Sequence, residues 1–74
     1  MDVLFIEQKI KEIIAELEKE VMEVVMDESL DKKETNLRMK PLKSTRQVLE
    51  NAMESIRMID RVAKEEMERW SVYF

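Results

Sequence analysis

Any chemistry in this chain must come from carboxylates, hydroxyls and amines, because histidine and cysteine are both absent from its 74 residues. Without cysteine there is no disulfide and no zinc–thiolate site, and without histidine the commonest metal ligand and the commonest general base are missing. The serines therefore have no partner to activate them as nucleophiles. The composition predicts that the protein is not an enzyme, holds no cofactor and turns over no small-molecule substrate.

The glutamates form two clusters that a helix would gather on its surface. The first cluster contains Glu12, Glu16, Glu20 and Glu23, and the second contains Glu65, Glu66 and Glu68. Carboxylate metal centres in helical bundles combine glutamates with histidines, which are missing here. Charged ridges are usually solvated faces, so we expect no metal, with an all-carboxylate Mg²⁺ site as the alternative.

A basic stretch near the middle of the chain contains Arg38, Lys40, Lys43 and Arg46 and no acid. These four side chains are candidate contacts for an anion, such as the phosphate of a nucleic acid or an acidic partner. The alternative is a solvated turn whose charges oppose an acidic body, since the net charge of the chain is −4. Proteins that bind single-stranded nucleic acid stack the bases on aromatic side chains, and no aromatic residue lies among these four. We therefore prefer the solvated turn.

Aromatic residues stand near the two ends of the chain, as Phe5, Trp70, Tyr73 and Phe74. A hairpin that brings the two ends together would gather them. They would then form an aromatic plug that closes one end of a helical bundle. The alternative is a docking knob, because Trp and Tyr dominate the energetics of many interfaces.

The elements that position these side chains are predicted to be helices. The chain is 41% charged and 45% hydrophobic, with no glycine and one proline, Pro41. Glu, Lys, Arg, Leu, Met and Ala dominate, and all of them favour helices. This is the composition of amphipathic helices.

The first half of the chain repeats apolar residues with the 3.6-residue period of a helix. The repeat runs through Val3, Ile6, Ile10, Ile14, Leu17, Val21 and Val24. Asp2 is placed to cap the start of this helix.

The second half repeats apolar residues every seven positions, at Leu42, Leu49, Ile56, Ala63 and Trp70. It predicts a helix over about 41–73. This helix starts either with Pro41 at its first position or with a capping box that begins at Ser44.

The charged segment between the two halves allows two interpretations. In the preferred one, the first helix spans about 2–35 and Asn36 is its left-handed cap. In the other, it spans about 2–26, and Ser29 caps a short separate helix that ends before Pro41. Either way, residues 1–74 make a single helical-hairpin domain with a charged turn.

Folding the two helices together gives an antiparallel pair. In the predicted register, the numbers of opposing residues add up to a value in the low or middle seventies. Trp70 then lies against Val3 or Ile6, and Leu17 lies against Ile56 or Ile59.

One seam cannot cover all the apolar surface, because residues such as Phe5 and Met22 fall beside the main stripe of the first helix. Exposed apolar patches usually mark contact sites. We therefore predict an all-α fold in which two antiparallel hairpins dimerise into a four-helix bundle. The predicted dimer or partner interface contains Phe5, Ile10, Ile14, Leu17, Val21, Met22, Val25, Leu49, Ile56, Ile59, Trp70 and Phe74.

The predicted function is that of a small adaptor or regulator, a homodimer that binds another protein. The alternatives are a structural subunit of a hetero-complex and a nucleic-acid-binding regulator that uses the basic turn. Dimerising hairpins occur among plasmid copy-control adaptors, small viral proteins and toxin antagonists, and the shape does not choose among them. The amino terminus does not resemble a signal peptide and no apolar run reaches about 18 residues, so we expect a cytoplasmic protein without a membrane span.

Overall fold

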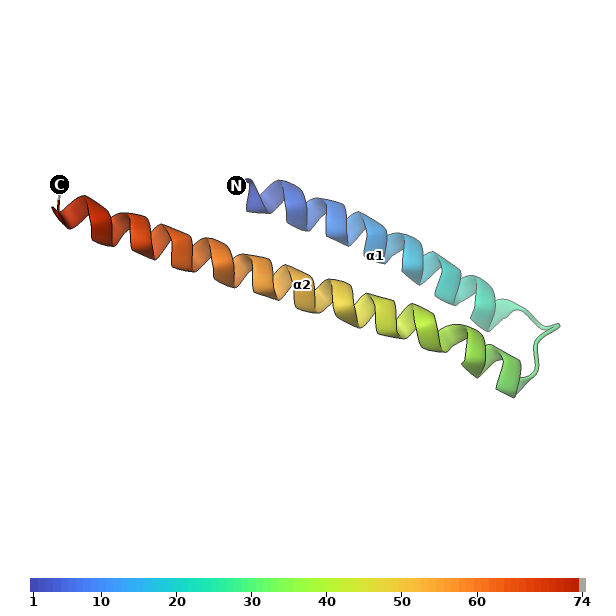
Figure 1. The fold of residues 1–74 in the computed structure, drawn as a ribbon. Coiled ribbons are helices and arrows are strands. Elements are labelled where there is room, and N and C mark those ends of the chain that lie inside the picture. Colours follow the sequence, from blue (N-terminus) through green and yellow to red (C-terminus); the bar gives the residue numbers. More distant parts are fainter. Residues whose placement is uncertain (74) are drawn as a thin grey trace.

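Two helices folded back on each other make up the structure. The computed structural model describes the backbone of residues 1–73 and the side chains of residues 1–70. Helix α1 (Val3–Met26) and helix α2 (Lys32–Tyr73) form an antiparallel hairpin (Figure 1). The Cα trace measures 66 × 18 × 9 Å, so the molecule is extended. The predicted all-α hairpin is confirmed.

An aspartate caps each end of helix α1. Asp2 caps its start as predicted, because its Oδ1 accepts a hydrogen bond from the backbone N–H of Phe5 at 3.1 Å. At the other end, Asp27 Oδ1 accepts from the backbone N–H of Ser29 at 3.0 Å and from the Ser29 hydroxyl at 2.5 Å. Such local bonds offer the backbone an alternative to the helix. The preferred prediction, in which α1 continues to about residue 35, is therefore wrong.

Helix α2 begins earlier than predicted, because Asp31 is its cap. The backbone N–H of Glu34 donates to Asp31 Oδ1 at 2.7 Å, which satisfies one of the unpaired N–H groups of the first turn. Ser29 belongs to the turn and caps no short helix. The predicted start near residue 41 is wrong, since α2 begins at Lys32.

Pro41 lies inside α2, and the helix continues through it (Figure 1). Proline removes one backbone hydrogen bond, so the carbonyl of Leu37 has no amide donor four residues later. An interior proline costs about 3 kcal/mol relative to alanine. The long runs of helix-forming residues on both sides, and the partial burial of Met39 and Leu42, offset this cost.

Two ion pairs between the helices show the register of the hairpin. Glu7 binds Arg57, and Glu18 binds Arg46 at 3.1 Å; in both pairs the residue numbers add up to 64. The predicted register in the seventies is therefore wrong. Its cause is the position of the turn, which lies at residues 27–31 and so closer to the amino terminus than expected.

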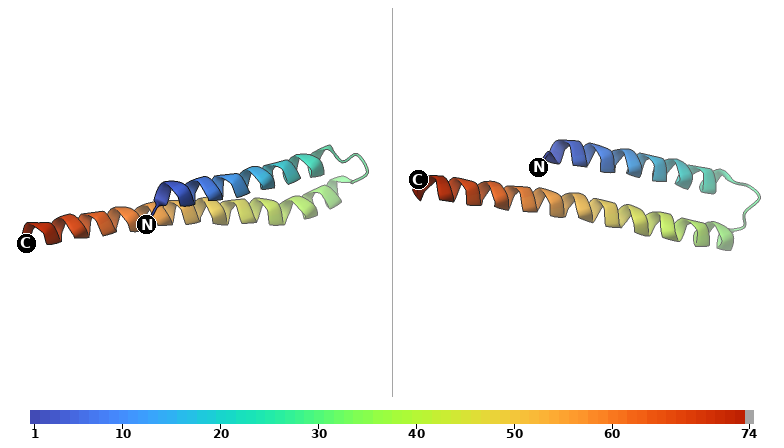
Figure 2. Two further views of the ribbon diagram at one scale, coloured as in Figure 1. Left: turned by 90° about the horizontal axis from the view of Figure 1, so that it is seen from above. Right: turned by 45° about the horizontal axis from the view of Figure 1, so that its top comes forward.

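The two helices differ greatly in length, so α2 extends beyond α1. At 1.5 Å per residue, the 24 residues of α1 span about 36 Å and the 42 residues of α2 about 63 Å. Both views in Figure 2 show the carboxyl-terminal part of α2 projecting past the amino terminus of α1. Residues 61–70, which we call the overhang, are all exposed. Trp70 thus lies beyond α1, and Phe5 is level with Ile59 instead.

Candidate interaction surfaces

The residues predicted to form an interface divide into two groups. One group is buried or half-buried between α1 and α2, and contains Ile10, Ile14, Leu17, Val21, Leu49 and Ile56. The other group is exposed and contains Phe5, Met22, Val25, Ile59 and Trp70. Phe74 lies outside the described residues. The hairpin therefore uses six residues of the predicted set for its own seam and leaves five in solvent.

The exposed surface is much larger than a chain of this size should have. A compact monomer of 8.9 kDa is expected to expose about 4,800 Å². This chain exposes 6458 Å², and among the described residues Ile14 alone is buried. The excess of about 1,600 Å² is comparable with the area that one subunit buries in an obligate dimer.

The middle of α2 carries a second face that contains no charge. It comprises Thr45, Val48, Ala52, Ser55, Ile59 and Val62, which we call the uncharged strip. At 100° per residue, the seven charged residues between Pro41 and Val62 all fall on about one third of the helix circumference, away from this strip. In a chain that is 41% charged, such segregation indicates a face that packs against another helix.

Five members of the uncharged strip do not belong to the predicted interface, namely Thr45, Val48, Ala52, Ser55 and Val62. The seven-residue repeat of larger apolar side chains directed attention to the seam with α1. The strip lies about a quarter of a turn away and consists mostly of small or β-branched residues, so it has no strong hydrophobic signal. The signal that could have revealed it is the absence of charge over several turns.

A shallow apolar depression continues the uncharged strip toward the overhang. It is lined by Met58, Ile59, Val62, Ala63 and Glu66. Ile59 is 61% exposed and Val62 is 44% exposed. Burial of such side chains stabilises a complex in proportion to the apolar area removed from water. The depression is therefore a place where the side chains of a second helix could pack.

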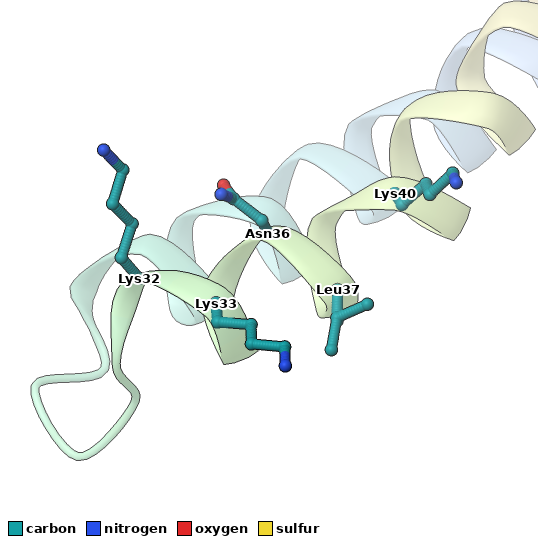
Figure 3. A pocket seen from close by; sticks show the side chains of 5 residues that line it. All are labelled: Lys32, Lys33, Asn36, Leu37 and Lys40. Atoms are coloured by element: carbon teal, nitrogen blue, oxygen red, sulfur yellow. The ribbon is translucent and has the colours of Figure 1, made fainter.

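A second depression lies at the start of α2, and Figure 3 shows the side chains that line it. Lys32 and Asn36 extend to one side of the helix in this view, whereas Lys33 and Leu37 extend to the other. The ammonium groups of Lys32 and Lys33 therefore point apart. Binding of a phosphate would need cationic groups that converge on one point.

Two of the four predicted anion contacts interact with carboxylates of their own chain. Arg46 binds two carboxylates of its own chain, Glu18 at 3.1 Å and Glu50 at 3.2 Å. The charge of Arg38 acts on Asp27, whose pKa is lowered mainly by hydrogen bonds from Ser29 and to a smaller extent by that arginine. Nucleic-acid binding by Arg38, Lys40, Lys43 and Arg46 stays a prediction, which salt-dependent retention on DNA or RNA would test.

The carboxylates of the hairpin pair with neighbouring cations. The hydrogen bond from Arg57 lowers the pKa of Glu7, and the same bond raises the pKa of Arg57. Asp60 binds Lys64 at 2.9 Å and raises the pKa of that amine. Over the described part of the chain, no three carboxylates gather closely enough to hold a metal ion. In the Glu7–Arg57 and Asp60–Lys64 pairs, the cation is exposed and the carboxylate is half-buried.

No protein-family model, curated protein or solved structure matches this chain. Within the described residues, neither α1 nor α2 has the combination of length and apolar content needed to cross a membrane.

Proposed function

We propose that this chain is a small, non-enzymatic adaptor or regulator that acts as a homodimer and binds another protein. Two hairpins would form a four-helix bundle. The observation that carries the proposal is the exposed surface, which exceeds that of a compact monomer of this mass by about 1,600 Å².

The small core of the hairpin supports this proposal. Ile14 is the one buried side chain among the described residues, and the other seam residues are only half-buried. A chain of this size rarely gains more than about 3–5 kcal/mol from a single core, and small domains are usually stabilised by disulfides, metals or association. Cysteine and histidine are absent, which leaves association.

The surface that would receive another protein lies on α1, near the turn. Met22, Val25 and Met26 are exposed by 58%, 57% and 71% and lie apart from the uncharged strip of α2. Methionine is flexible and polarisable, and it is common on surfaces that adapt to partner helices. We therefore assign these three residues to partner binding and α2 to self-association.

Light scattering of the purified chain tests the proposal. At micromolar concentration we expect a helical particle of about twice the chain mass of 8.9 kDa. A well-folded monomer at that concentration would contradict it.

A second candidate function is that of a subunit buried in a hetero-complex. The overhang favours it, because residues 61–70 are all exposed in the hairpin. A chain that is unfolded when pure would support this second function against the first. Circular dichroism recorded on the light-scattering sample separates the two.

A further inference from the structure

We propose that the uncharged strip packs against the same strip of a second copy, with the two α2 helices antiparallel. The two-fold axis passes between Met53 and Glu54. This inference rests on the proposed homodimer and specifies its geometry. The partner is thus a second copy of this chain, and the surface is α2 from about Pro41 to Val62.

The spacing and size of the strip residues are symmetric about that axis. Reading from either end, the steps between members are three, four, three, four and three residues. Antiparallel pairing therefore aligns every member with a member of the other copy. Thr45 meets Val62, Val48 meets Ile59, and Ala52 meets Ser55. Medium-sized β-branched side chains lie toward both ends, and the two small side chains lie at the centre, where they let the helices approach closely.

The charges at the two ends of the strip favour the antiparallel orientation. Continuing the same spacing, the first charged residue is Arg38 at one end and Glu66 at the other. Because aligned residue numbers add up to 107, antiparallel pairing aligns Glu66 with Pro41 of the second copy, one turn from Arg38, and aligns Arg38 with Arg69. The basic residues 37–46 then face the overhang, which contains three cations and three anions. Parallel pairing would place Arg38 beside Arg38 and Glu66 beside Glu66 of the second copy. It would also juxtapose two segments 32–46, each with six cations and one anion, and such like-charge contacts are costly.

The position of the strip around α2 fits a four-helix bundle. The strip lies about a quarter of a turn from the side of α2 that faces α1, as the corner helix of a square bundle requires. Each α2 would then contact its own α1 on one side and the second α2 on the next. The overhang beyond Val62 would run alongside the first turns of the partner's α2, so the dimer covers the part of the helix that α1 leaves bare.

The length of the strip is sufficient for a stable interface. Residues 41–62 span about 33 Å of helix at 1.5 Å per residue. Val48, Ile59 and Val62 keep 65%, 61% and 44% of their surface exposed in the hairpin, and all of them would be covered by a second strip. The 1,600 Å² of excess surface estimated above is of the order that such a bundle buries per chain.

Disulfide trapping tests the geometry directly, because the chain contains no natural cysteine. The double variant Val48→Cys/Ile59→Cys places a thiol pair at each of two equivalent contacts of the antiparallel dimer. Within one helix the two thiols are about 16 Å apart along the axis, too far for a disulfide, which needs Cα atoms within about 7 Å. The two single variants place identical residues about 16 Å apart in the antiparallel dimer. Glu54→Cys is level with the axis but on the charged side.

Under mild oxidation we expect the double variant to form a covalent dimer, and each single variant and Glu54→Cys to remain uncoupled. Efficient coupling of either single variant, with a dimer mass in light scattering, would overturn the antiparallel geometry while leaving the homodimer intact. No coupling in a chain that scatters as a dimer would place the interface elsewhere. A folded monomer would overturn both this inference and the proposed function.

A charge-insertion pair checks the same surface without cysteine chemistry. Ser55→Glu introduces two carboxylates near the axis, and Ser55 is exposed in the hairpin, so folding of the single chain has no reason to change. We expect the dimer to dissociate at concentrations at least about 100-fold higher than the original chain. Gln47→Glu adds the same charge about 110° around α2 from the middle of the strip, on the side that faces neither α1 nor the second copy, and should leave dimerisation unchanged. Equal dissociation constants for the two variants would overturn the proposal.

Discussion

Truncation of Ile59 to alanine measures how much of the exposed apolar surface is covered in solution. In the hairpin, 61% of Ile59 is exposed. Complete burial of a large aliphatic side chain is worth about 1.5–3 kcal/mol, so covering the exposed part contributes about 1–2 kcal/mol per chain. Alanine retains the β-carbon and each dimer contains two copies, so we expect Ile59→Ala to weaken dimerisation by about 2–3 kcal/mol.

That loss corresponds to a dissociation constant raised about 30- to 150-fold, since 1.4 kcal/mol is a factor of ten. Sedimentation equilibrium or dilution-dependent circular dichroism measures it. Met22→Ala is the matched control, because Met22 is equally exposed, at 58%, but lies on α1 away from the uncharged strip. A change in the dissociation constant no larger than that of this control would show that Ile59 lies outside the dimer interface. Substitutions of exposed residues outside an interface usually change the free energy of unfolding by no more than about 0.5 kcal/mol.

Four further predictions concern the hairpin itself. Ile14→Ala should lower the free energy of unfolding by about 2–5 kcal/mol, measured by urea titration, because Ile14 is the buried core residue. Pro41→Ala should raise it by up to about 3 kcal/mol, and a loss of stability would show that the helix breaks there. The Trp70 emission should shift to shorter wavelength as concentration rises through the dimer range; an unchanged spectrum while the mass doubles would contradict coverage of the overhang. The hydrogen bond from Arg57 lowers the pKa of Glu7 from its ordinary value of 4.5. The Glu7–Arg57 pair therefore stabilises the folded chain fully above pH 4.5, and this stabilisation is lost as the pH falls through the lowered pKa. Glu7→Gln should remove this part of the acid sensitivity in thermal melts recorded at different pH values.

The helices were predictable because their pattern extends over many turns. In α1 the apolar period from Val3 to Val24 matches the residues that the structure places against α2. Asp2 was predictable as a cap because it directly precedes the first apolar residue of that pattern. Both inferences depend only on local sequence. Signals of this kind survive whatever the tertiary structure does.

The turn and the register were not predictable, because two local signals compete between Asp27 and Pro41. Pro41 favours a helix stop, although a cost of about 3 kcal/mol can be outweighed in a helix of 42 residues. Asp31, three residues before Glu34, favours a helix start instead, and the structure follows this signal. The error moved the turn along the chain, and every opposing pair in the hairpin moved with it. Sequence periodicity alone does not distinguish such registers.

The uncharged strip and the overhang lead to the same conclusion about folding. The hairpin buries one face of α2 against α1 over about 36 Å, while α2 is about 63 Å long. The unmatched length and the unmatched face both belong to α2, so one antiparallel contact between two α2 helices covers both. A helix that gains its packing from a partner is stable only while the partner is bound. We therefore expect folding and dimerisation to occur in a single transition whose midpoint rises with protein concentration. A midpoint that does not depend on concentration, in a chain that scatters as a dimer, would show that the hairpin is stable by itself.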